Sequence, residues 1–229
     1  MSISHVFFDL DGTLTDPAEG ITRCIRHALK IMGLPAPPCS DLVRFIGPPL
    51  RNTFAQLLGR NHGDAQVERA VGLYRERFSS VGLFENRLYP GVPEMLESLL
   101  EAGFGLYVAT SKPQAFAASI CEHFGLHRYL SGIYGPELNG WFDDKGDLLA
   151  HLLSEEGIVA QGALMVGDRE HDIVAAQKNG ILSAGVTYGY GTREELEKAG
   201  AAHICNSVAD IEMLLRKKVR RVRPPRFIK

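Results

Sequence analysis

The stretch FFDLDGTLTD, residues 7 to 16, decides the fold of this chain. Its apolar lead-in, Val6-Phe7-Phe8, has the length and branching of a buried parallel strand. Asp9 and Asp11 follow, and an extended chain points both carboxylates the same way, at the edge where open α/β sheets keep their ligands. Two such close carboxylates repel each other unless a cation or a shared proton compensates them. The pair therefore predicts a Mg²⁺ site with one carboxylate free to attack or to carry a proton.

The next two residues suit an anion. Gly12 allows a sharp backbone turn, and the Thr13 hydroxyl can donate a hydrogen bond. An ordinary acidic turn after a strand would have the same composition, so the stretch needs support from elsewhere in the chain.

Strand and helix patterns alternate from Tyr89 onward. The expected strands are 104–109, 129–134, 163–166, 182–186 and 203–205. This spacing predicts an α/β fold with a Rossmann-like parallel sheet and helices on both faces. Between residues 17 and 82 only helical patterns occur, so this part is expected to form a separate subdomain inserted after the first strand.

A second polar segment is VATSKP, residues 108–113, where a strand delivers Thr110 and Ser111 to the same sheet edge as Asp9. Hydroxyls and backbone N–H groups at a helix N-terminus bind phosphate well. Simple helix capping is the alternative interpretation of these two residues.

Two further segments carry charge. Lys145 begins a helix, where it opposes the helix dipole, and such local conflicts tend to mark function, although a solvent-facing lysine is the simpler alternative. In MVGDREHD a strand ends at Val166, and Asp168 and Asp172 follow four residues apart, on one side of the next helix. Two more carboxylates near Asp9 would complete an oxygen-rich site for Mg²⁺.

Taken together and in this order, DLDGTLTD, VATSKP, the lysine and GDREHD resemble the four motifs of the haloacid dehalogenase superfamily of phosphatases, over nearly the whole chain. The resemblance implies that Asp9 is a nucleophile that forms an aspartyl-phosphate and that Asp11 is the general acid and base. It makes Thr110 the phosphate-binding hydroxyl, and Lys145 the cation that holds the phosphoryl group and the charge of the nucleophile.

The same resemblance implies a Mg²⁺ cofactor. Its ligands would be Asp9, the backbone carbonyl of Asp11, and Asp168, while Asp172 would stand behind them and orient water or Lys145. Haloacid dehalogenases that resemble this fold lack the second aspartate, so the presence of Asp11 disfavours dehalogenation.

The helical insert resembles the four-helix, C1-type cap of members named phosphoglycolate phosphatase or 5′-nucleotidase. We expect a core of residues 1–15 and 88–219, a cap of 16–87 and a basic tail of 220–229. In RFIGPPLR, Arg44 or Arg51 could pair with a second anionic group on the substrate, or both could be solvated surface charges.

These expectations describe a Mg²⁺-dependent phosphomonoester hydrolase whose partner is a small phosphorylated metabolite, either phosphoglycolate-like or a 5′-nucleotide. Gly12, Thr13 and Ser111 are expected to bind the substrate together with the arginines. Two alternatives stay open. One is a phosphosugar mutase of the same superfamily, and the other is a catalytically silent binding or regulatory member.

The composition of the chain argues against several kinds of site and partner. The four cysteines are widely spaced without a CxxC pair, which argues against structural zinc and a disulfide framework. Neither a signal peptide nor a membrane-spanning stretch is evident, so we expect a soluble, cytoplasmic monomer or homodimer without a membrane partner. Residues 216–229 hold eight of the 25 basic and none of the 27 acidic residues, which leaves an acidic body. Because no set of aromatic residues accompanies these charges, nucleic acid is not an expected partner.

Truncation after Val219 is predicted to leave the turnover of a small phosphomonoester nearly unchanged, because all four motifs lie upstream of the tail. Steady-state kinetics of the full-length and truncated proteins measure this. A large loss of turnover in a truncated protein with an intact circular dichroism spectrum would show that the tail reaches the active site.

Overall fold

The computed structural model describes residues 2–61 and 63–218, so the predicted basic tail, 220–229, lies outside the described residues. Its core is a six-stranded sheet in the order β5-β4-β1-β6-β7-β8. The strands are β1 (His5–Phe8), β4 (Gly105–Ala109), β5 (Gly132–Tyr134), β6 (Ala163–Gly167), β7 (Leu182–Val186) and β8 (His203–Cys205). Every neighbouring pair is parallel, so all carboxyl ends meet at one edge, and the predicted parallel α/β sheet is confirmed.

Alternate residues of the central strand face opposite layers of helices. Phe7 packs in one buried cluster with side chains of α7 (Lys145–Glu155) and α8 (Glu170–Lys178). Phe8 belongs to the other cluster, which α5 (Val92–Glu101), α6 (Gln114–His123) and α10 (Val208–Lys218) complete. The short helix α9 (Arg193–Lys198) lies between β7 and β8 in the chain. Both faces of the sheet are thus covered, which explains why its strands are almost continuously apolar.

One expected strand is shorter than predicted. Residues Leu126–Tyr129 form a 3₁₀ turn, and only Gly132–Tyr134 pairs with the sheet. Tyr129 is buried as a turn residue, so its apolar character serves the core without any strand pairing. The sequence pattern alone could not separate these two ways of burying it.

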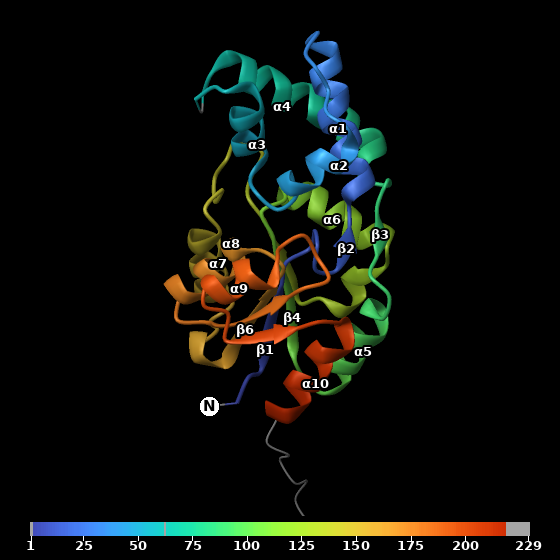
Figure 1. Cartoon of the computed structure of the whole chain (residues 1–229). Helices are drawn as coiled ribbons and strands as arrows, with labels where there is room; N and C mark the ends of the chain where they lie inside the picture. Colours follow the sequence, from blue (N-terminus) through green and yellow to red (C-terminus); the bar gives the residue numbers. More distant parts are fainter. Residues whose placement is uncertain (1, 62, 219–229) are drawn as a thin grey trace, which may run out of the picture.

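The inserted segment is helical, as predicted. Its helices are α1 (Ala18–Ile31), α2 (Cys39–Leu42), α3 (Leu50–Leu58) and α4 (Ala65–Arg77), with a π-helical turn at Phe78–Gly82. Figure 1 shows them together at the top, apart from the helices that cover the sheet. The exact domain boundaries at 15/16 and 87/88 stay a prediction.

Two short strands join this segment to the sheet. β2 (Thr15–Asp16) and β3 (Arg87–Leu88) pair antiparallel where the chain leaves for the helical segment and returns from it. Arg87 donates two hydrogen bonds to Asp16 Oδ2, from Nε at 2.9 Å and from Nη2 at 2.6 Å. The Tyr190 hydroxyl donates to the other Asp16 oxygen. The pair of strands β2 and β3, which connects the helical segment to the sheet, is therefore held to the loop after β7.

Within the part of the chain that the structure describes, no helix combines the length and the apolarity that crossing a bilayer requires.

In the helical segment the backbone of α1 lies close to the backbone of the π-helical turn, and substitutions of glycine test this contact. A Cβ atom on Gly20 in α1 would lie 2.2 Å from the Gly82 carbonyl oxygen, whereas a Cβ on Gly72 in α4 would meet nothing within 4 Å. Gly20→Ala is expected to lower the free energy of unfolding by about 1–3 kcal/mol, because the backbone must shift. Gly72→Ala is expected to raise it by about 0.5–1 kcal/mol through helix propensity. Urea denaturation measures both, and a Gly20→Ala protein as stable as the unmodified one would contradict the packing.

Candidate active site

Three neighbouring strands bring the predicted residues to one place. Asp9 follows β1, Thr110 follows β4 and Asp168 follows β6, and β1 lies between the other two strands. The Asp9 N–H donates to the Val166 carbonyl at 2.8 Å, which fixes the turn after β1 to the end of β6. The three side chains are buried, so the sheet edge holds them in a setting of low dielectric constant.

Lys145, the first residue of α7, reaches into this group. Its ammonium nitrogen lies 2.9 Å from Asp9 Oδ1 and also contacts Asp172 Oδ1. Burial opposes the charged form of Lys145, but Asp172 and Asp9 together hold the pKa of this ammonium above its ordinary value. Its position at a helix start, against the dipole, is thus explained by two carboxylates outside that helix.

The carboxylates outnumber this cation. Oxygens of Asp9, Asp168 and Asp172 all lie within 4.8 Å of one another, and Lys145 supplies one positive charge. Burial, then the charges of Asp9 and Asp172, raise the pKa of Asp168 well above its usual range. Asp168 Oδ2 accepts from the Tyr190 N–H at 2.7 Å, while buried Oδ1 has no partner among the described residues. With all three carboxylates ionised, Lys145 leaves two negative charges uncompensated. These charges and the unpartnered oxygen fit a divalent cation that prefers oxygen ligands.

The structure brings Asp172 into this cluster, whereas the sequence placed it behind the metal ligands. The side chain of Asp11 lies outside the cluster, which is consistent with a role for its backbone carbonyl. The individual roles of these residues stay predictions.

Gly12 is required by close packing. Its φ is +89°, and a Cβ atom there would lie 2.2 Å from Asp168 Oδ2. The neighbouring Thr13 hydroxyl oxygen is buried without a partner among the described residues, and the Thr13 carbonyl accepts from the Tyr188 hydroxyl at 2.9 Å. The contact of Thr13 with substrate stays a prediction.

A residue that the sequence analysis did not single out lies beside Asp11. The Lys112 ammonium is 2.7 Å from Asp11 Oδ2 and lies 4.4 Å from the centre of the Phe78 ring. Burial raises the pKa of the Asp11 carboxyl, and Lys112 opposes that rise. The Thr110 hydroxyl accepts from the Lys112 N–H at 3.2 Å. The only signal in the sequence was the place of this lysine two residues after Thr110.

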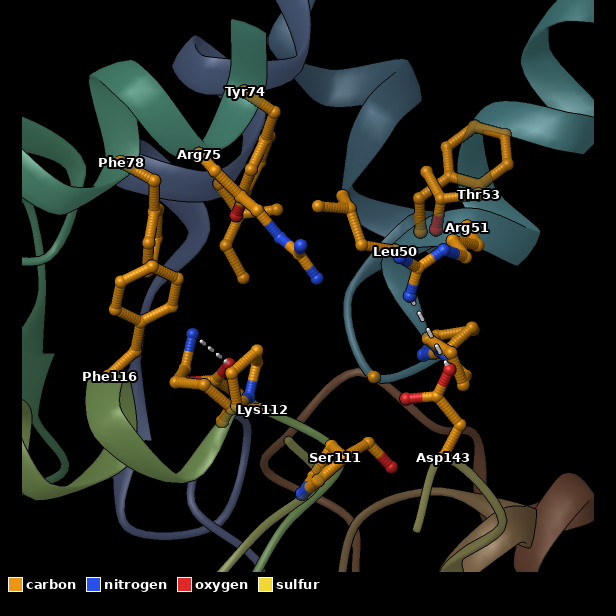
Figure 2. A pocket seen from close by; sticks show the side chains of 18 of the residues that line it. Leu50, Arg51, Thr53, Tyr74, Arg75, Phe78, Ser111, Lys112, Phe116 and Asp143 are labelled. Atoms are coloured by element: carbon orange, nitrogen blue, oxygen red, sulfur yellow. Dashed lines mark ion pairs between the residues drawn. The ribbon is translucent and has the colours of Figure 1, made fainter. Parts of the chain in front are cut away.

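A cleft opens above Asp11, between the sheet edge and the helical segment (Figure 2). Its empty space is about 750 Å³, a volume that includes space open to solvent. Asp11, Ser111 and Lys112 line its floor. Of the predicted catalytic residues Asp11 therefore borders the cleft, whereas Asp9, Thr110 and Lys145 are not part of its lining.

The two arginines predicted to bind substrate differ in position. Arg51 lines the cleft, with Nε 2.8 Å from Glu68 Oε1 and Nη1 3.8 Å from Asp143 Oδ2. Arg44 is exposed, lies over the Phe45 ring and faces a separate depression beside Arg169. A substrate in the cleft is therefore closer to Arg51, and the role of Arg44 stays a prediction.

Arg169, also missed from the sequence, connects the acidic cluster to the helical segment. It follows Asp168, and its Nη1 donates to the Ile46 carbonyl at 2.6 Å while its Nε donates to Glu195 at 2.8 Å. Ile46 belongs to the IGPPL loop, whose next residues line the cleft. One side chain thus links the turn that carries Asp168 to the cleft wall.

Comparison with known proteins gives a family. The sequence model of the family described as haloacid dehalogenase-like hydrolase matches residues 6–186 of this chain. A 5′-nucleotidase of Pseudomonas aeruginosa is 46% identical over 92% of this chain and 95% of its own length. A protein of Mycobacterium tuberculosis named tyrosine-protein kinase PtkA is 36% identical over 91% of this chain and 70% of its own. A phosphoglycolate phosphatase of Vibrio parahaemolyticus is 29% identical over 91% of this chain and 94% of its own length.

Solved structures agree on the fold. A crystal structure of a predicted phosphatase from Clostridium acetobutylicum superposes with a TM-score of 0.91 at 40% identity, over 95% of this chain and all of the other.

Asp168→Asn is expected to weaken Mg²⁺ binding at least tenfold, because it removes one of the charges that the cation would compensate. Isothermal titration calorimetry of the purified protein measures the affinity without any substrate. Asp210→Asn, at a half-buried position of α10, is the matched control and should bind Mg²⁺ as before. Equal Mg²⁺ affinity in Asp168→Asn and unmodified protein would exclude this carboxylate as a ligand.

Proposed function

The chain belongs to the haloacid dehalogenase-like hydrolase family, as its motifs predicted, and we propose that this phosphatase hydrolyses small phosphomonoesters through an aspartyl-phosphate on Asp9. One observation carries the proposal. A buried cluster of three carboxylates, two of them in contact with Lys145, has two more negative than positive charges when ionised, and Asp11, two residues after Asp9, lines a cleft. Phosphoryl transfer needs cations that compensate the nucleophile and the phosphoryl group, and a site from which water can be excluded.

Asp9 is the nucleophile in this scheme. Lys145 holds Asp9 Oδ1, which leaves the second carboxylate oxygen for in-line attack on phosphorus. The bond from phosphorus to the ester oxygen breaks as the bond from Asp9 forms. The Lys145 ammonium also stabilises negative charge on the phosphoryl oxygens, beside the hydroxyls of Thr110 and Ser111.

Asp11 is the general acid and base in this scheme. It lies on the floor of the cleft, where it would donate a proton to the leaving oxygen and then take one from the water that hydrolyses the aspartyl-phosphate. The Lys112 ammonium, 2.7 Å from Asp11 Oδ2, holds the carboxyl group in place, and burial raises the pKa of Asp11, which favours the protonated form that the first step needs.

Mg²⁺, when bound by Asp9, Asp168 and the Asp11 carbonyl, would supply the missing positive charge and polarise the phosphoryl group. The chemistry of the donor set fits this ion, because all the available ligands are oxygens.

A 5′-nucleotide is the substrate that we favour over a phosphoglycolate-like acid. The 46% identical relative named 5′-nucleotidase supports this choice, since the match extends over nearly all of both chains.

Release of phosphate from a panel of phosphomonoesters with Mg²⁺ tests the function. Wild-type protein is expected to hydrolyse 5′-nucleotides, and Asp9→Asn is expected to lose at least about a thousandfold in kcat, because the amide cannot attack phosphorus. Asp147→Asn, an exposed carboxylate on α7 that pairs with Lys178, should keep full activity.

The same panel separates the alternatives. A phosphosugar mutase would release little phosphate and would interconvert sugar phosphates, and a silent binding member would do neither. Full turnover in a cleanly purified Asp9→Asn protein would contradict the proposed mechanism.

A further inference from the structure

The wall of the cleft contributed by the helical segment holds two buried polar atoms without a hydrogen-bond partner among the described residues. They are Arg75 Nε in α4 and Thr53 Oγ1 in α3, and both residues line the cleft. Unsatisfied buried polar atoms are uncommon in native proteins, and each costs about 1–3 kcal/mol. Both atoms are covered by protein, but their side chains line the same cleft, so a side-chain rotation on binding would let a ligand supply the missing partners.

Arg75 differs from its neighbour Arg51. Two carboxylates, those of Glu68 and Asp143, already compensate the charge of Arg51. Arg75 donates from Nη1 to the Leu138 carbonyl at 3.0 Å, and no carboxylate in the described ranges lies within 4.0 Å of its guanidinium. Figure 2 shows the guanidinium pointing into the middle of the cleft. Of the two arginines that line this wall in the described part of the chain, Arg75 is therefore the one without a carboxylate within 4.0 Å.

The surface around Arg75 is aromatic. Tyr74 stacks on Phe78 with ring centroids 5.2 Å apart and an interplanar angle of 16°, and Phe116 meets Phe78 edge-on at 5.4 Å. Ile21, Ile25 and Leu50 extend the apolar lining. Tyr74 and Phe78 are buried and cover each other, so the lining offers a ligand ring edges and aliphatic side chains. Such a lining provides few hydrogen-bond partners for the hydroxyl groups of a sugar. A nucleoside offers both a flat ring for the apolar surface and oxygen acceptors for the two polar atoms.

We propose that Arg75 and Thr53 form the recognition site for the nucleoside of a 5′-nucleotide, a specificity determinant that rests on the proposed phosphatase function. The Arg75 Nε–H donates to an oxygen of the nucleoside, and the Thr53 hydroxyl completes a second hydrogen bond. Tyr74, Phe78 and Phe116 supply the apolar surface beside them. The phosphate lies below, at Asp9 and Lys145.

The test compares variants on substrates that do and do not carry these acceptors. Arg75→Met keeps the length of the side chain without its donors, and Thr53→Val keeps the shape of threonine without its hydroxyl. Arg69→Met, on the exposed side of the same helix, is the matched control. Uridine 5′-monophosphate carries acceptors, phenyl phosphate has a ring without them, and phosphoglycolate has a carboxylate only.

For uridine 5′-monophosphate, kcat/KM is expected to fall about 10- to 100-fold in Arg75→Met and about 3- to 10-fold in Thr53→Val, as expected for a charged and a neutral hydrogen bond. Phenyl phosphate turnover should stay within about twofold, which also shows that each variant is folded. Arg69→Met should match the wild type on all three substrates.

An equal loss with phenyl phosphate would overturn the proposal, because the residues would then support the whole site and not the nucleoside. A loss confined to phosphoglycolate would overturn it as well, by assigning Arg75 to a carboxylate. Equilibrium binding of uridine 5′-monophosphate to Asp9→Asn and to Asp9→Asn/Arg75→Met is independent of turnover. A weaker affinity in the double variant supports the recognition site even if the phosphatase function fails, and equal affinities exclude it.

Discussion

The Lys145 ammonium lies among carboxylates that it cannot neutralise alone, and much of the surrounding structure serves to keep them together. It contacts Asp9 and Asp172, while Asp168 lies within 4.8 Å of both. Taking like charges out of water costs several kcal/mol for each ion that stays uncompensated. The parallel sheet supplies what the cluster needs, because the ends of β1 and β6 hold Asp9 and Asp168 rigidly side by side.

The same cluster is connected to the helical segment by two side chains of neighbouring loops. Tyr190 donates its backbone N–H to Asp168 and its hydroxyl to Asp16, where the chain crosses into the helices. Arg169 reaches from the turn after β6 to the Ile46 carbonyl. The position of the cleft wall and the position of the acidic cluster are therefore mechanically linked, which suits an enzyme that must exclude water while phosphorus is under attack.

Much of this arrangement could be predicted from the sequence, because local signals carry it. Apolar runs ending in Asp9, Thr110 and Asp168 gave three strand ends, and parallel topology necessarily brings such ends to one edge. Residues whose partners are distant in the chain could not be predicted this way. Arg75 and Thr53 looked like ordinary helix positions, and nothing local distinguished Arg44 from Arg51 before their packing was known. The roles of Lys112 and Arg169 depend on contacts with Asp11 and Ile46, more than a hundred residues away.

The most direct test of the account asks where the phosphoryl group is held during turnover. Borohydride reduces an acyl phosphate to an alcohol, so it converts a phosphorylated aspartate into homoserine, which peptide mass spectrometry can locate. Wild-type protein quenched with borohydride during hydrolysis is predicted to carry homoserine at position 9, only when Mg²⁺ and substrate are both present. Homoserine at another aspartate, or none at all during rapid phosphate release, would contradict the central role of Asp9.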